Sequence, residues 1–197
     1  MKKLPFLLIF LFLFSSSCSQ ENTYFQRVLN ADSESENWLL HGRTYDESRF
    51  SPLKDINDSN VQDLGLAWSF ETGTNRGHET TPIVVDGMMF ISAPWSVVFA
   101  LDPKTGEKLW SFDPQADKAW ARNACCDVVN RGVAVWEDQV IFATIDGRLI
   151  SLNKDSGKVN WDVLTIDKSK PYTITGAPRI IDGKIIIGNG GGEYGVR

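Results

Sequence analysis

Short apolar stretches separated by turn residues follow one another along the chain after residue 65. Residues 81–91 hold two such stretches joined by Asp86-Gly87, and an Asp-Gly pair in this setting is a strong hairpin signal. Residues 98–102 and 105–110 add two more stretches, and the last ends in Trp110. The pattern predicts a unit of four antiparallel strands over residues 81–110.

The same pattern returns twice. Residues 131–142, 149–153 and 156–161 form a second unit, in which Trp161 follows the turn at nearly the same spacing, and a third unit begins at residues 177–188. Four-stranded units repeating at this length are typical of a β-propeller. We therefore predict an all-β propeller, of which this chain covers roughly the first two to three blades, with each closing Trp packed between neighbouring blades.

The third unit stops at Arg197, before its closing strand. We therefore expect an N-terminal fragment of a longer protein, truncated within a blade. The alternative is a short protein that dimerises to complete its blades.

The first 18 residues have the layout of an export signal. Two lysines precede the apolar residues 4–14, and three serines lead to Cys18. The apolar stretch is shorter than the ~20 residues that a membrane-spanning helix needs. We predict a lipoprotein-type signal peptide over residues 1–18 with a lipid on Cys18, and localisation in the periplasm; the alternative is ordinary cleavage near Ser17. Residues 19–36 are polar and are predicted to be a flexible tether, with the propeller part over 37–197.

Composition narrows the range of partners. The chain has 42% hydrophobic and 23% charged residues, which is ordinary for a globular protein, and a net charge of −5. Because no basic patch stands out, nucleic acid is not an expected partner.

Cys125 and Cys126 are adjacent, which is rare. Neighbouring Cα atoms lie about 3.8 Å apart, whereas a relaxed disulfide has Cα atoms roughly 4.4–6.8 Å apart. A bond between the two sulfurs would therefore be strained, and strained features cluster at ligand clamps and active sites. Export would permit this bond. The alternative is two reduced, buried cysteines that pack as small hydrophobic side chains.

Polar residues also stand at the start of each unit: Glu79, Arg131 and Thr175. First strands of propeller blades lie nearest the central channel, so these side chains would converge there; the alternative is three unrelated surface residues. Near the end of the chain, a glycine-rich stretch allows close approach of a ligand, and Glu193 follows it as a carboxylate of the kind that binds Ca²⁺. The alternative is a wide turn with a solvated Glu193.

Together these motifs resemble the pyrroloquinoline-quinone (PQQ) dependent alcohol dehydrogenases of the methanol dehydrogenase and quinohaemoprotein ethanol dehydrogenase group. The resemblance covers nearly all of residues 37–197. It rests on residues 37–38, 42–44, 49–53, 60–61, 64–68, 78–82, 175–178 and 190–197, and on Cys125-Cys126 with Arg131.

The resemblance implies an eight-bladed propeller that oxidises a small alcohol to an aldehyde by hydride transfer to PQQ, with Ca²⁺ or a lanthanide beside the quinone. The catalytic base and further metal ligands would lie beyond Arg197, so no catalytic residue is assigned and the chain alone is expected to be inactive. A periplasmic cytochrome, or a haem c domain in the missing part, would accept the electrons.

The resemblance also implies residue roles. Cys125–Cys126 would be a disulfide lying flat on one face of the quinone. Three side chains would bind the carboxylate and ring oxygens of the cofactor: Glu79, Arg131 and Thr175. The backbone of the glycine stretch would line the edge of the cofactor: Gly190, Gly191 and Gly192. Glu193 would coordinate the metal. Some members supply a side-chain hydroxyl where this chain has Gly190, and Ala is usual where it has Gly192.

Two other functions share parts of this pattern. Lipoprotein propellers that act as scaffolds for outer-membrane protein assembly have the same blade repeat, but they would not need Cys125-Cys126, Arg131 or Glu193. A membrane-bound glucose dehydrogenase relative is the other, and the cysteine pair argues against it.

Overall fold

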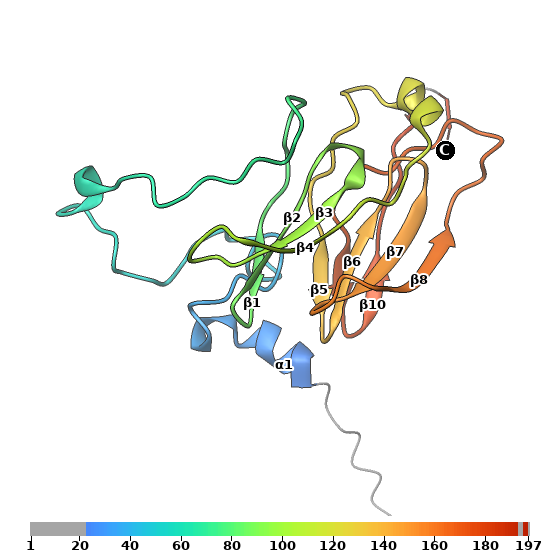
Figure 1. The fold of residues 1–197 in the computed structure, drawn as a ribbon. Coiled ribbons are helices and arrows are strands. Elements are labelled where there is room, and N and C mark those ends of the chain that lie inside the picture. The colour runs from blue at the N-terminus through green and yellow to red at the C-terminus, as the bar shows by residue number, and fades with distance from the viewer. Residues whose placement is uncertain (1–22, 193–194, 197) are drawn as a thin grey trace, which may run out of the picture.

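The computed structural model describes residues 23–192 and 195–196, in which the strands form antiparallel sheets in chain order (Figure 1). The first sheet contains β1 (Ile83–Val85), β2 (Met88–Ser92), β3 (Val98–Leu101) and β4 (Lys108–Phe112). The second sheet contains β5 (Ala134–Trp136), β6 (Gln139–Ala143), β7 (Arg148–Asn153) and β8 (Val159–Leu164). A two-stranded sheet contains β9 (Arg179–Ile181) and β10 (Lys184–Ile186).

The four-stranded units predicted from the sequence are confirmed. Asp86 and Gly87 turn β1 into β2 with φ of 51° and 76°, and positive φ at both central residues is what a type I′ hairpin turn requires. The pairing of the third and fourth strands shifts register at the same place in both sheets, after Ala100 and after Ser151. The two units are thus copies of one structure down to this irregularity.

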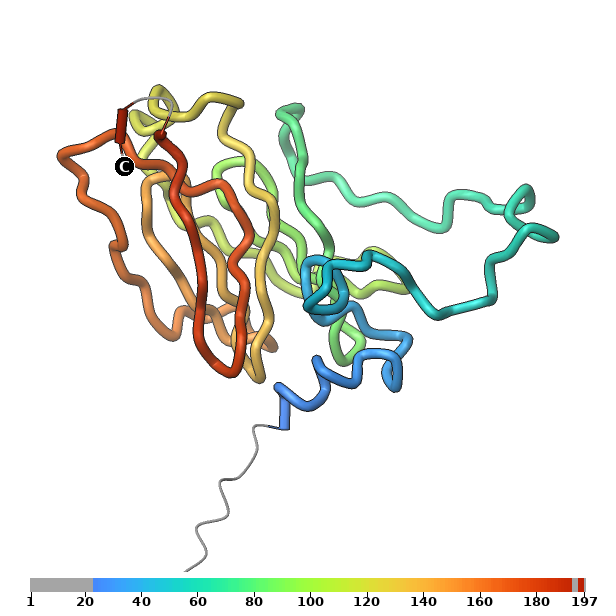
Figure 2. The backbone as a smooth tube through the Cα atoms, turned by 180° about the vertical axis from the view of Figure 1, so that it is seen from behind, coloured from blue at the N-terminus to red at the C-terminus, as the bar shows by residue number. Residues whose placement is uncertain are grey.

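The sheets stand side by side, with β1 next to β5 and β5 next to β9 (Figures 1 and 2). Their facing side chains form one core, because the inner strands are apolar on both faces. The core includes side chains that are less than 2% exposed: Ile83, Val85, Phe90, Phe142, Ile150 and Leu152.

Tryptophans join each unit to the turn of the next, as the repeat predicted. The Trp110 indole N–H donates to the Lys154 carbonyl at 2.9 Å, and its ring lies against Gly157. Trp68 makes the same contact one unit earlier: its N–H donates to the Pro103 carbonyl at 3.1 Å and its ring lies against Gly106.

The N-terminal segment differs from the flexible tether expected over residues 19–36. Residues Thr23–Leu29 form helix α1, and Tyr24 and Val28 on one face of it are buried in the core. The Tyr24 ring lies 5.1 Å from that of Trp136. Arg27 on the same helix pairs with Asp86 of the first hairpin at 2.6 Å. Two apolar residues four apart, Tyr24 and Val28, were the sequence signal for this helix, but the polar composition of residues 19–36 obscured it.

The remaining helices are short 3₁₀ turns: η1 (Ala31–Ser33), η2 (Val61–Asp63), η3 (Pro94–Ser96) and η4 (Lys118–Asn123). Between η1 and β1 the chain contains only η2, and the part around η2 extends away from the sheets in both views (Figures 1 and 2). Within the described residues, no helix combines the length and apolar character needed to cross a bilayer.

Replacing Gly157 by alanine is expected to destabilise the protein. The added methyl group would lie 2.8 Å from the Trp110 ring, at a backbone φ of +67°. Overpacking of this kind costs typically about 1–3 kcal/mol. Gly87→Ala is the matched control, because Gly87 has φ of +76° but no atom within 4 Å of the new methyl. The thermal unfolding midpoint of the full-length protein should fall further for Gly157→Ala; equal midpoints would contradict a role of the Trp110 contact in stability.

Candidate functional site

A pocket opens beside the adjacent cysteines. Its wall comes from the loop before β5, from the segment before β9 and from the start of the glycine stretch. The lining residues are Ala124, Cys125, Cys126, Asp127, Val129, Arg131, Thr173, Thr175 and Gly190.

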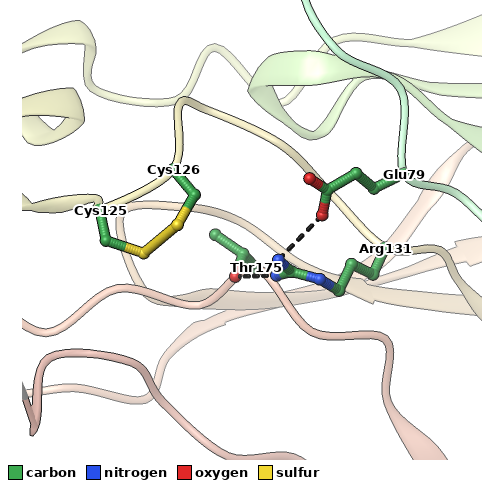
Figure 3. Close-up of a disulfide and its surroundings, with 5 residues drawn as sticks. All are labelled: Glu79, Cys125, Cys126, Arg131 and Thr175. Atoms are coloured by element: carbon green, nitrogen blue, oxygen red, sulfur yellow. Dashed lines mark hydrogen bonds and ion pairs between the residues drawn. A yellow bond between two sulfur atoms is a disulfide. The ribbon is translucent and has the colours of Figure 1, made fainter.

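Cys125 and Cys126 form a disulfide with Cα atoms 3.8 Å apart. Both residues are exposed, so the alternative of two buried, reduced thiols is wrong for this structure. Figure 3 shows the two sulfurs on the side of their loop that faces Thr175 and Arg131. The disulfide is therefore a rigid apolar element on the pocket wall.

The structure brings Glu79, Arg131 and Thr175 together. The Thr81 amide donates to the Arg131 carbonyl at 3.2 Å, and the Arg131 amide donates to the Thr175 carbonyl at 3.0 Å. On this frame, Arg131 Nη1 donates to Thr175 Oγ1 at 2.6 Å and Nη2 pairs with Glu79 Oε2 at 2.8 Å (Figure 3). The roles of these residues toward a cofactor stay predictions.

The Arg131–Glu79 pair contributes little to folding. Each side chain is 41% exposed, and exposed ion pairs stabilise proteins by about 0–1 kcal/mol. A guanidinium carries five N–H donors in a planar fork, so Arg131 keeps donors beyond those that reach Glu79 and Thr175. The fork matches a carboxylate, which it can bind through two parallel hydrogen bonds. The arrangement suits capture of a planar anion.

Asn130 fixes the backbone between the disulfide and Arg131, and the sequence analysis missed it. Its side chain is buried; Nδ2 donates to the Ala143 carbonyl at 2.9 Å and to Ser96 Oγ at 3.2 Å. Its Oδ1 accepts from the Gly132 amide at 3.0 Å. A single amide side chain within an apolar stretch was the only sequence signal for Asn130. Its two Nδ2 partners could not be identified from the sequence, because they are distant along the chain.

A second buried polar residue, Asp146, holds η4, the helix that leads into the disulfide. Asp146 accepts a hydrogen bond from the Asp117 amide at 3.2 Å, and the Asp117 side chain in turn caps η4 through the Ala119 amide at 2.9 Å. Burial raises the pKa of the Asp146 carboxyl, but hydrogen bonds from Thr144 and Asp117, together with the positive charges of Arg148 and Lys168, outweigh it and the pKa lies below its usual value. The carboxylate therefore stays charged and keeps η4 anchored at neutral pH.

An ion pair ties the disulfide loop to the segment that carries Glu79. Arg76, three residues before Glu79, pairs with Asp127, the residue after the disulfide. The Arg76 guanidinium also lies 5.7 Å from the Trp95 ring centre, and the Trp95 amide donates to the Val128 carbonyl at 2.9 Å. The sequence analysis missed this contact, which joins segments that lie far apart in the chain.

The glycine stretch reaches the pocket at one position. Gly190 lines it, whereas Gly191 and Gly192 do not. Gly191 has φ of +123°, and a Cβ there would lie 2.2 Å from Val196 Cγ2, so only glycine fits.

The predicted metal ligand Glu193, the predicted lipid site Cys18 and the predicted signal peptide over residues 1–18 lie outside the described residues. In the described part of the chain, no group of three or more His, Cys, Asp or Glu residues could hold a metal ion.

Several known proteins that are similar to this chain are named as alcohol dehydrogenases. A family profile described as "Glucose/ethanol/alcohol dehydrogenase, beta-propeller domain", with the short name PQQ, matches residues 38–194. Quinohemoprotein alcohol dehydrogenase ADH-IIG from Pseudomonas putida is 54% identical over 172 residues, covering 87% of this chain and 24% of that protein.

Two solved structures show the same fold. The quinohemoprotein alcohol dehydrogenase ADHIIG from Pseudomonas putida HK5 superposes with a TM-score of 0.85 at 53% identity, covering 87% of this chain and 25% of that one. A europium-containing methanol dehydrogenase superposes with a TM-score of 0.82 at 38% identity, covering 87% of this chain and 30% of that one.

These matches confirm the predicted β-propeller class and the predicted resemblance. The chain spans about a quarter of the length of the curated relatives it matches. With most of its residues matched by the family profile, the chain belongs to the PQQ-type glucose/ethanol/alcohol dehydrogenase β-propeller family.

Proposed function

We propose that this chain is the N-terminal part of a PQQ- and Ca²⁺-dependent dehydrogenase that oxidises a small alcohol to an aldehyde. The observation that carries the proposal is the placement of the Cys125–Cys126 disulfide and Arg131 on one pocket wall. An assembly scaffold would have no use for this combination of an exposed disulfide and an anion-binding fork.

The side chains of the pocket fit PQQ, which is a flat tricarboxylate. Arg131 and Thr175 would bind a carboxylate at its rim, and Glu79 would hold the guanidinium in place while accepting from the cofactor edge. The rigid disulfide would cover one ring face and exclude water from it. PQQ, when bound, supplies the acceptor for the hydride and thus for the two electrons of the alcohol.

The metal site is proposed from the sequence. Glu193 would hold Ca²⁺, or a lanthanide in its place, through carboxylate oxygens of the kind that hard cations prefer. One solved relative is described as europium-containing, which supports the lanthanide alternative.

The partners are proposed in the same way. Relatives named quinohemoproteins support a haem c domain or a separate cytochrome as electron acceptor. Export to the periplasm and a lipid anchor on Cys18 rest on the signal-like residues 1–18 alone.

Arg131→Lys is expected to weaken PQQ binding by about 10–100-fold, because lysine cannot form the paired hydrogen bonds of the guanidinium. The measurement is an absorbance titration of the full-length apoprotein with PQQ in the presence of Ca²⁺. Arg179→Lys is the matched control, because Arg179 pairs with Glu47 at 2.8 Å outside the pocket. Unchanged affinity in Arg131→Lys would remove Arg131 from the binding site; no PQQ binding by the wild type would sink the proposed function.

The disulfide is expected to be intact in the exported, PQQ-loaded protein. Under denaturing conditions, Cys125 and Cys126 should take up a thiol label only after reduction, and reduction should also abolish dye-linked alcohol oxidation. The label is located by peptide mass spectrometry. Labelling of both cysteines without reduction would contradict the proposed face of the quinone site.

Glu193→Gln is expected to raise the Ca²⁺ concentration needed for half-maximal alcohol oxidation by about tenfold or more, because an amide lacks the charge that binds a hard cation. Glu107→Gln is the control, since Glu107 is exposed in a turn of the first sheet. A Ca²⁺ dependence equal to that of the wild type would show that Glu193 is not a metal ligand.

A further inference from the structure

Thr173 and Gly190 face each other on the pocket wall. The Gly190 amide donates to the Thr173 carbonyl at 2.6 Å, and the Thr173 amide donates to the Gly190 carbonyl at 3.3 Å. A Cβ built on Gly190 would lie only 2.9 Å from Thr173 Oγ1, which is closer than real Cβ contacts come. The Thr173 hydroxyl thus lies where a side chain at position 190 would project.

Thr173 is a buried residue whose hydroxyl makes no hydrogen bond to the described part of the chain. The residue is 5% exposed, and none of the hydrogen bonds among the described residues involves its Oγ1. Its Oγ1 is not one of the fully buried polar atoms that lack a partner, so the hydroxyl is accessible from the pocket that Thr173 lines. A ligand bound there can take the hydrogen bond that this hydroxyl has to offer.

Thr173 lines the same pocket as two other polar side chains, Thr175 and Arg131. Residues two apart on an extended segment point to the same side, and Thr173 and Thr175 both line the pocket. Thr175 Oγ1 accepts from Arg131, so the guanidinium and two hydroxyls form a row of polar groups beside the disulfide. A row of this kind matches the oxygen-bearing edge of a flat anion.

We propose that Thr173 Oγ1 donates a hydrogen bond to an oxygen at the edge of the bound PQQ, and that position 190 is glycine so that this hydroxyl can reach the cofactor. The proposal rests on the proposed function, because it requires PQQ in this pocket. It adds a cofactor-binding residue to those expected from the sequence.

The first test replaces the Thr173 hydroxyl by a methyl group, which keeps the shape of the side chain. In the full-length apoprotein with Ca²⁺, Thr173→Val should weaken PQQ binding by about tenfold in an absorbance titration, which is the loss of one hydrogen bond to a charged group. Thr173→Ser should restore most of the affinity. Thr165→Val is the matched control, because the Thr165 hydroxyl donates to the Gly147 carbonyl at 2.9 Å outside the pocket and should leave PQQ binding unchanged.

The second test moves the hydroxyl from position 173 to position 190, which faces it on the pocket wall. Gly190 does not have positive φ, so its backbone accepts serine. Gly190→Ser alone should weaken PQQ binding, because the new Cβ displaces the Thr173 hydroxyl, and Thr173→Ala alone should also weaken it. The double variant should bind PQQ more tightly than either single variant, since the introduced serine then supplies a hydroxyl from the vacated space; such non-additivity is diagnostic of direct coupling.

The outcomes separate the two proposals. If the wild type binds PQQ and Thr173→Val binds it equally well, the role of Thr173 is overturned while the proposed function stands. Additive losses in the double variant would likewise overturn the pairing of Thr173 with Gly190. If the wild type does not bind PQQ, the proposed function fails and the role of Thr173 falls with it.

Discussion

Two main-chain hydrogen bonds join the segments that lead into successive sheets: Thr81 to Arg131 at 3.2 Å, and Arg131 to Thr175 at 3.0 Å. Because these bonds use backbone atoms, the spacing of the three segments does not depend on the side chains they carry. Glu79, Arg131 and Thr175 therefore meet wherever the sheets pack in this order. Sheet packing therefore determines that these three positions lie together, and the side chains at these positions determine what can bind there.

Sheet packing is itself held by contacts at the opposite end of the strands. The rings of Trp68 and Trp110 each lie against a glycine in a turn of the first and the second unit, so each of these two units is oriented by the tryptophan that precedes it. Buried polar groups then fix the pocket loop relative to the sheets: Asn130 connects the loop before β5 to η3 and to the end of β6. Rotation of one sheet would break these bonds as well as the core.

The repeating units could be predicted because their signals are local. Asp86-Gly87 and the evenly spaced Trp110 and Trp161 each report on a few neighbouring residues. The role of Asn130 could not be predicted, because its partners Ser96 and Ala143 become neighbours only after two sheets have packed. Helix α1 was missed for a different reason. Its apolar face is short, and the stability of so short a helix comes from burial against Trp136 rather than from its own sequence.

The polar residues around the pocket divide into two sets by burial. Asn130 and Asp146 are buried and have their hydrogen bonds completed by the protein, so they hold the loop that carries the disulfide. Arg131 and Glu79 are 41% exposed, and their ion pair contributes little to the stability of the fold. The loop is thus anchored by buried polar groups and presents an exposed cation and a rigid disulfide to the pocket, which is the arrangement that the proposed cofactor site requires. In the proposed function, the groups that these buried hydrogen bonds position would contact the cofactor.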